Sequence, residues 1–283
     1  CDDGNSENEQ GLIYSIDTWA DQILNFIETV ILPKHGTDTK IHVIGNSVGG
    51  HLAVILAARR PDWIASICLL NATPVWGLNL KGWSGHLPPP QFPRLLGRVL
   101  FDLIRDLSTI DQYLDAAYVN REAFEDTSLV KQIRSCTEGK GGHAAFASIL
   151  YSPPATYTAE NFYDELSNLK CDVLLLFGKD DPWCTPAFAK RMYQCLEQRK
   201  QDRYAGRYIE IDNVGHCPNH EAPTAVGKIC QRWIRTDKEG RGFKPLIDNE
   251  IDDFSEEWCR DIQAREVKDA SLSVMEKIIT TFV

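Results

Sequence analysis

A G-x-S-x-G pentapeptide at residues 45–49 is the first place in the sequence where side-chain chemistry is expected. A β-branched run at 41–44 precedes Ser47 and an alanine-rich apolar run follows it, so the pattern predicts a strand, a sharp turn and a helix. Such a turn holds the serine in a strained backbone conformation. Glycine is expected at 45 and 49 because a side chain at either position would clash with neighbouring backbone. The Val48 N–H, at the start of the helix, would face a developing oxyanion.

Two downstream residues supply the partners that a nucleophilic serine needs. Asp181 follows a buried strand at 173–177, and His216 follows another at 208–211. A hydroxyl is a poor nucleophile at neutral pH, so it requires a base within hydrogen-bond reach, and the base requires a carboxylate to fix its tautomer. The order Ser47, Asp181, His216 is the nucleophile, acid, histidine order of α/β-hydrolases. The three residues together therefore predict an acyl-transfer site.

Neighbouring residues compete for two of these roles. Asp180 is the alternative acid, but the acid of this fold usually lies three residues after the strand-end glycine, which favours Asp181. His216 directly follows Gly215 in the turn after a strand, whereas His220 lies near the start of the last core helix, where capping or surface exposure is expected. Packing roles are expected for the other histidines and for the two cysteines near these residues: His35, His42, His51, His86, His143, Cys184 and Cys217.

Alternating strands and helices are expected to position these residues. Ser15 is a helix N-cap signal, and apolar residues then recur at helical spacing up to Pro33. Continuous apolar strands at 41–44 and 64–70 indicate a parallel sheet covered on both faces. From residue 75 the alternation of strands and helices stops, and amphipathic helices follow from Pro93. The sequence thus predicts an α/β-hydrolase fold with a mostly parallel sheet and a helical cap insert, lacking its N-terminal strands; a small separate helical domain is the alternative to a cap.

Four parts are expected along the chain: a first part of the hydrolase core (1–74), a helical cap (75–165), a second part of the core (166–236) and an acidic helical extension (237–283). In the extension, apolar residues recur at helical spacing, which favours a helix docked on the protein itself; a partner-binding helix is the alternative, and the acidity disfavours a lipid-surface helix. The apolar residues are Phe254, Trp258, Ile262, Leu272, Met275, Ile279 and Phe282.

Composition excludes several classes of protein. A net charge of −10 argues against nucleic-acid binding and against electrostatic attachment to anionic lipid. No apolar run is long enough to span a membrane, so any membrane or protein contact would be superficial. Nine cysteines without C-x-x-C spacing indicate reduced thiols, and neither a metal nor a cofactor is expected. The glycosylation sequon at Asn71 ends an apolar strand and is best explained by chance. A start at Cys1 favours a fragment of a longer chain over a processed protein.

Several motifs together resemble the pheophytinase and chlorophyll dephytinase group of plant and algal serine hydrolases. The resemblance covers roughly residues 12–236. It implies hydrolysis of a phytyl ester of a chlorophyll derivative in plastids. The first strands of that fold and its His-Gly loop, which gives the second oxyanion amide, are absent here, and Asn219-His220-Glu221 differs from the usual His-Asp-Glu. The motifs are Gly45 to Gly50, Asn71-Ala72-Thr73-Pro74-Val75-Trp76-Gly77, Ala147-Ser148-Ile149, Gly178 to Trp183 and Gly215-His216-Cys217-Pro218.

The sequence is therefore interpreted as a serine hydrolase of a hydrophobic carboxylic ester. Trp76, Trp83 and Phe92 are candidates for lining a pocket for a flat macrocycle or a long isoprenoid, with core packing an equal alternative. One rival hypothesis is the same machinery acting on another lipid ester, a thioester or a C–C bond, since a triad does not specify the substrate. Another is a non-catalytic member of the fold that binds a hydrophobic ligand or a partner protein.

Overall fold

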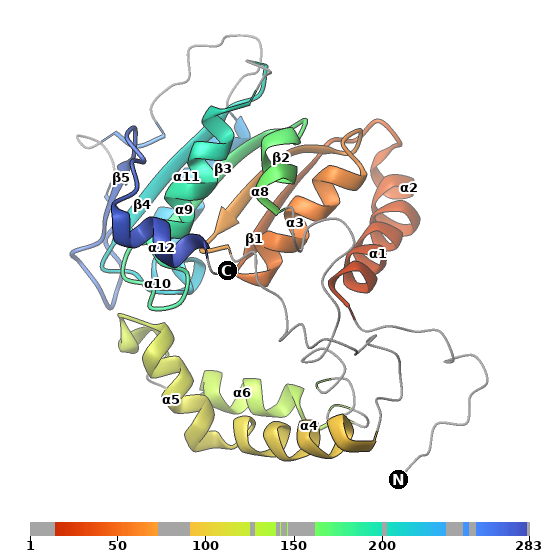
Figure 1. Cartoon of the computed structure of the whole chain (residues 1–283), viewed down its shortest axis with the longest axis vertical. Coiled ribbons are helices and arrows are strands. Elements are labelled where there is room, and N and C mark those ends of the chain that lie inside the picture. The colour runs from red at the N-terminus through yellow and green to blue at the C-terminus, as the bar shows by residue number, and fades with distance from the viewer. Residues whose placement is uncertain are drawn as a thin grey trace.

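Four of the predicted strands form one parallel sheet in the computed structural model, which describes residues 15–72, 91–124, 128–139, 142, 146, 162–199, 203–235, 246–248 and 253–281. The five described strands lie in the order β1-β2-β3-β4-β5 (Figure 1). The first four pair in parallel and β5 pairs antiparallel with β4. This confirms the predicted α/β class with a mostly parallel sheet. The strands are β1 (Ile41–Asn46), β2 (Ile64–Leu70), β3 (Asp172–Gly178), β4 (Gly206–Asp212) and β5 (Gln263–Glu266).

Helices cover both faces of this sheet. On one face α3 (Val48–Arg59), α8 (Phe162–Asn168) and α9 (Pro186–Glu197) pack against alternate strand residues such as Leu69. On the other face α11 (Pro223–Arg235) packs against the intervening residues such as Leu70. Both faces of β2 and β3 are therefore buried, which explains their uninterrupted apolar sequence.

The first helical stretch begins at the predicted cap. Ser15 accepts a hydrogen bond from the Thr18 N–H at the start of α1 (Ile16–Phe26). A π-helical turn (Ile27–Ile31) and α2 (Leu32–His35) continue it, so the helix passes Pro33 instead of ending there. It ends before Gly36, whose φ of 100° is a conformation that favours glycine.

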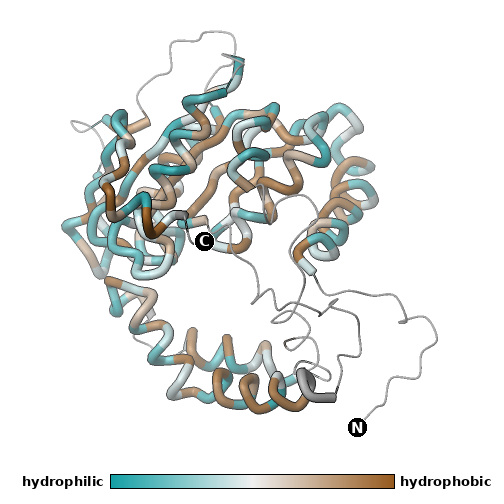
Figure 2. Tube along the Cα trace, in the orientation of Figure 1, coloured by the Kyte–Doolittle hydropathy of each residue, from teal (hydrophilic) through white to brown (hydrophobic). Residues whose placement is uncertain are grey.

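Helices lie beyond the carboxyl ends of the strands, where the cap is predicted (Figure 1). α5 (Leu107–Ala117) and α6 (Ser128–Cys136) share a small apolar core of their own, and α4 (Gln91–Ile104) and a short 3-10 helix (Arg121–Phe124) complete this part. Figure 2 shows apolar residues along α4 as well as along the strands. Apolar spacing also predicts a helix at 143–149, of which the structure describes residue 146 alone, in a helical conformation. The four-part division of the chain stays a prediction.

The C-terminal extension differs from its prediction. The helix expected from Phe254, Trp258 and Ile262 is wrong, because residues 253–262 form no helix. Phe254 and Ile262 instead bury themselves in the core on the α11 side of the sheet. The chain then adds β5 to the edge of the sheet and ends with α12 (Val274–Thr281), which contacts α9. None of the helices in the described parts of the chain has the length and apolar character that crossing a bilayer requires.

Candidate active site

Ser47 occupies a strained turn between β1 and α3. Its φ of 53° and ψ of −119° lie outside the regions that non-glycine residues normally adopt. The Ser47 N–H donates to the Leu70 carbonyl at 2.9 Å, which ties the turn to the end of β2. Val48 is the first residue of α3, so its N–H belongs to the helix N-terminal amides that lack a partner within the helix. This backbone geometry fits a nucleophile elbow.

Close packing explains only one of the two glycines of the pentapeptide. A Cβ on Gly45 would lie 2.1 Å from the Gly49 carbonyl oxygen, so no side chain fits there. The clash predicted for Gly49 is wrong, since no described atom beyond its chain neighbours and the backbone of its own helical turn lies within 4 Å of a Cβ built at that position. Gly50 is instead the second tight position, where a Cβ would lie 2.5 Å from the Cβ of Ala72. The turn therefore requires small residues at 45 and 50.

Asp181 and His216 meet at the carboxyl ends of β3 and β4. His216 Nδ1 lies 2.7 Å from Asp181 Oδ2, and both side chains are buried. The Trp183 N–H donates to the other carboxylate oxygen at 2.7 Å. Burial raises the pKa of Asp181, but the hydrogen bond and charge of His216 and the backbone amides of Trp183 and Cys184 outweigh it and lower that pKa overall. An ionised Asp181 can only accept, so Nδ1 of His216 carries the proton and donates it.

The turn of Ser47 contacts the turn of His216 through the residue before the serine. Asn46 Nδ2 donates to the His216 carbonyl at 2.9 Å and to the Leu70 carbonyl at 3.1 Å. The Ser47 side chain does not cap α3, and a direct contact between its hydroxyl and the imidazole stays a prediction. Catalytic hydrogen bonds are often long before substrate binds. Asn46 thus places the two turns side by side.

The competing residues lie in other surroundings. Asp180 Oδ2 accepts a hydrogen bond from the Asn213 N–H at 2.9 Å in an exposed turn. His220 Nδ1 lies 3.0 Å from the hydroxyl oxygen of Tyr118. Neither residue contributes to the Asp181–His216 pair.

Asn71 is a component of the site that the sequence analysis missed. Its Nδ2 donates to Asp181 Oδ2 at 2.8 Å and to the Gly178 carbonyl at 3.1 Å, and its Oδ1 accepts from the Gly178 N–H at 2.8 Å. The residue is fully buried and has a φ of 39°, which asparagine tolerates better than most residues. Its place at the end of β2, one strand away from Asp181, was the available signal. Because the Asn71 side chain is buried, the glycosylation sequon at this position is consistent with a chance occurrence.

Glu221 is a second missed residue, and it holds the turn that carries His216. Its Oε1 accepts from the Gly215 N–H at 2.9 Å, and its Oε2 accepts from the Val119 N–H at 2.8 Å and the Asn120 N–H at 3.0 Å. Burial raises the pKa of Glu221, although these three amides act to lower it. The carboxylate therefore joins the histidine turn to the chain that leaves α5, and the His216 N–H reinforces this link by donating to a carbonyl at the end of that helix.

Two cysteines lie beside these residues. Cys184 Sγ lies within 4.8 Å of the Asp181 and His216 donor atoms, and these three residues are the group in the described chain whose atoms could bind a metal. The hydrogen bond between Asp181 and His216 already engages two of those atoms. Burial raises the pKa of Cys217, which disfavours its thiolate. None of the eight cysteines in the described ranges forms a disulfide, and the reduced state expected from their spacing stays a prediction.

Three predicted pocket residues cannot be placed. Trp76 and Trp83 lie outside the described residues, and Phe92 lies in α4 with its side chain undescribed. Trp183, which was not predicted as a pocket residue, is an aromatic side chain that contacts the site: its ring centroid lies 4.9 Å from that of His216, edge to face. About half of the Trp183 side chain is exposed, so it can also contact a ligand.

Comparison with known proteins connects this geometry to one family. The sequence pattern of the alpha/beta hydrolase family matches residues 4–228. The chain is 28% identical to the chloroplastic pheophytinase of Arabidopsis thaliana over 91% of this chain and 52% of that protein, so it spans about half the length of that relative. It is 27% identical to a proline iminopeptidase of Lactobacillus acidophilus over 83% of this chain and 77% of that protein. The structure of 2-hydroxy-6-oxo-6-phenylhexa-2,4-dienoate hydrolase from a Rhodococcus strain has the same fold, with a TM-score of 0.57, 19% identity, and coverage of 78% of this chain and 73% of that one.

Proposed function

Because the chain belongs to the alpha/beta hydrolase family, we propose that it is a serine hydrolase whose nucleophile, base and acid are Ser47, His216 and Asp181. The observation that carries this proposal is the buried hydrogen bond of 2.7 Å between His216 and Asp181, beside the strained turn that presents Ser47. A neutral imidazole held through Nδ1 leaves Nε2 free to accept a proton. This is the arrangement that activation of a hydroxyl requires.

The proposed reaction is an acyl transfer in two halves. Ser47 Oγ attacks the ester carbonyl carbon while His216 Nε2 takes the hydroxyl proton, and the Val48 N–H stabilises the oxyanion that forms. Collapse of this intermediate breaks the bond to the alcohol, which leaves with the proton from His216. A water molecule then attacks the acyl-enzyme with His216 again as the base, releasing the acid and restoring Ser47. Asp181 keeps the imidazole oriented and stabilises its charged form throughout.

The proposed substrate is a hydrophobic carboxylic ester, the phytyl ester of a chlorophyll derivative such as pheophytin. The similarity to pheophytinase over 91% of the chain supports this substrate class, as do the shared motifs around Ser47, Asn71 and His216. A plastid location for the chain is part of the same proposal. Pocket roles for Trp76, Trp83 and Phe92 stay predictions.

A second candidate is hydrolysis of a proline amide. The proline iminopeptidase relative has nearly the same identity, 27% against 28%, and the match spans 77% of its length. The same triad chemistry would cleave an amide or an ester, because the leaving group is protonated by the histidine in both cases. The two candidates differ in the ligand that the site recognises and not in its nucleophile.

A substrate panel on Ser47→Ala and the unaltered protein tests both candidates. Pheophytin, a 4-nitrophenyl acyl ester and proline 4-nitroanilide are supplied in turn, and Ser135→Ala, a change at an exposed serine on α6, is the matched control. We expect pheophytin hydrolysis by the unaltered protein and by Ser135→Ala, and none by Ser47→Ala at an unchanged melting temperature. Undiminished hydrolysis by Ser47→Ala would refute the nucleophile. Preferential cleavage of the anilide would replace the ester with the amide.

A further inference from the structure

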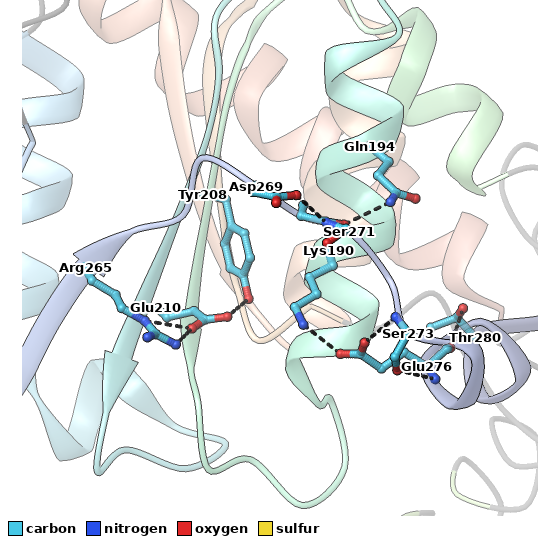
Figure 3. A network of polar contacts seen from close by, with 11 residues as sticks. Lys190, Gln194, Tyr208, Glu210, Arg265, Asp269, Ser271, Ser273, Glu276 and Thr280 are labelled. Carbon is cyan, nitrogen blue, oxygen red and sulfur yellow. Dashed lines mark hydrogen bonds and ion pairs between the residues drawn. The ribbon is translucent and has the colours of Figure 1, made fainter.

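The last helix, α12, docks on the protein through its polar side (Figure 3). Glu276 accepts a hydrogen bond from Lys190 Nζ of α9 at 2.7 Å, and its other oxygen caps the helix by accepting from the Ser273 N–H at 2.8 Å. Thr280, one turn further on, is almost fully buried. Gln194 of α9 holds the segment before the helix by donating to the Ala270 carbonyl at 2.9 Å. Polar contacts therefore fix the position of α12.

The opposite side of α12 is apolar and faces outward. Val274, Met275, Ile278 and Ile279 are 75%, 66%, 47% and 46% exposed, respectively. Surface helices of globular proteins normally bury their apolar stripe and expose their polar one. In α12 the arrangement is reversed. Clustered exposed apolar side chains of this kind mark a surface that binds an apolar ligand or partner.

A cleft separates α12 from the loop that carries the proposed acid. It has a volume of about 450 Å³, within the range typical of ligand sites. Asp180 and Thr185 line it from the β3–α9 loop, Ala187 lines it from the start of α9, and Glu276 and Ile279 line it on the side of α12. The cleft thus borders the turn of Asp181, and one member of the exposed apolar face of α12 forms part of its wall.

The cations around this cleft are all paired with carboxylates. Lys179 pairs with Asp212 at 2.7 Å, and Lys190 pairs with Glu276 at 2.7 Å. Arg265 pairs with Glu210, which also accepts from the Tyr208 hydroxyl (Figure 3). Each cation is matched to a carboxylate, and Asp180 accepts a hydrogen bond from the Asn213 N–H, so the walls offer no unpaired cation to an anionic ligand. The aliphatic stems of the lysines and the side chains of Pro186, Ala187 and Ile279 are left to contact an uncharged ligand.

We propose that α12 is an outer wall of the substrate site and that the hydrocarbon chain of the ester's alcohol lies in this cleft against Ile279. This inference rests on the proposed ester hydrolysis and adds the segment that selects the alcohol. The reacting carbonyl lies at Ser47, and the long alcohol extends past the Asp181 turn towards α12. Ile279 is then a residue that determines specificity for long alcohols, and the Lys190–Glu276 pair positions it.

Ile279→Ser tests the proposal by its selectivity between two esters. Pheophytin and the methyl ester of the same pheophorbide acid share the acyl part and differ only in the alcohol. We expect Ile279→Ser to raise KM for pheophytin about tenfold, the scale of losing one buried aliphatic contact, and to change kcat/KM for the methyl ester less than twofold. Ile279→Leu should restore the KM for pheophytin. Ile234→Ser is the matched control, since Ile234 is 38% exposed on α11 and does not line the cleft.

Lys190→Met tests separately whether the Lys190–Glu276 pair holds α12 in position. Loss of the pair with Glu276 should loosen α12 and raise KM for pheophytin in the same selective way, although Ile279 itself is intact. An equal loss on both esters in either variant, or no loss on pheophytin, would overturn the proposal. A change of oligomeric state in Ile279→Ser by light scattering would also overturn it, because the apolar face would then be an interface with a second copy.

Direct binding of phytol, measured by tryptophan fluorescence, separates this inference from the proposed function. It needs no turnover. Phytol binding that Ile279→Ser weakens about tenfold supports the cleft even if no ester is hydrolysed, in which case only the proposed function fails. Phytol binding that is equal in the two proteins, or absent from the unaltered protein, refutes the cleft even if pheophytin is hydrolysed.

Discussion

Replacement of Asn71 by alanine should lower both the stability of the fold and the catalytic rate that depends on Asp181. The change leaves the buried Gly178 N–H without its acceptor and removes a donor from Asp181. An unsatisfied buried group costs about 1–3 kcal/mol and a lost hydrogen bond to a charged group about 1.5–3 kcal/mol. Alanine is also disfavoured at a φ of 39°. Because such terms are not fully additive, we expect a loss of about 3–5 kcal/mol in the free energy of unfolding.

Urea unfolding and steady-state kinetics measure the two effects. The midpoint should fall by about 1 M or more, and kcat should fall about tenfold because the acid loses an anchor. Asn168→Ala is the matched control: this exposed asparagine donates one bond to the Asp164 carbonyl, and its loss should cost less than about 1 kcal/mol. If Asn71→Ala unfolds within about 1 kcal/mol of the unaltered protein and retains its kcat, the role assigned to Asn71 is wrong.

Asn71→Asp adds a pH dependence of known sign. The new carboxylate would face the Asp181 oxygen that now accepts from Asn71 at 2.8 Å. Two buried like charges raise the pKa of the pair above its unfolded value. Because the pKa is raised in the folded state, protonation of the pair relieves the repulsion. Asn71→Asp is therefore most stable below the unfolded pKa and loses stability as pH rises through the folded pKa. The deficit of Asn71→Asp relative to the unaltered protein should therefore shrink from pH 7 to pH 5, and a deficit that stays constant would contradict this reasoning.

Three further predictions concern other parts of the site and its supports. Gly45→Ala should prevent soluble folding because its Cβ would lie 2.1 Å from a carbonyl oxygen, whereas Gly49→Ala should express and melt like the unaltered protein; equal behaviour of the two would refute the packing argument. Burial lowers the pKa of His51 to about 4, so its contribution to stability is present above pH 6.5 and is lost as pH falls towards 4. His51→Leu should remove up to about 3 kcal/mol of this acid sensitivity in urea titrations, and an unchanged pH profile would count against it. Glu221→Gln should lower kcat with little change in KM, because an amide cannot accept from all the backbone N–H groups that hold Gly215 and its neighbours; a loss confined to KM would argue against a positioning role.

The parts of the fold that sequence reasoning predicted are those encoded locally. The elbow, its strand and its helix follow from one short motif, and the placement of His216 follows from a glycine after a buried strand. Asp181 was favoured over Asp180 by its distance from Gly178, and the structure brings Asp181 to His216. Strand ends of a parallel sheet meet at one edge, so residues distant in sequence come together there.

The parts that it missed depend on tertiary contacts. β5 has the sequence Gln-Ala-Arg-Glu, which shows no strand propensity, and it forms because the edge of β4 offers hydrogen bonds and Glu210 offers a partner for Arg265. Asn71 resembled a chance sequon because the role of its amide is visible only once β2 and β3 lie side by side. Periodicity predicted an apolar helix near Met275 and Ile279, yet it could not show that the helix docks through its polar side.

Labelling with a fluorophosphonate probe is the most direct test of the proposed nucleophile, since the probe reacts with a serine only when a neighbouring base activates it. The modified residue is identified by peptide mapping in the unaltered protein and in His216→Ala. We expect the label on Ser47 in the unaltered protein, and a rate lower by roughly 100-fold or more in His216→Ala. A label on another serine, no label at all, or equal rates in the two proteins would contradict the account.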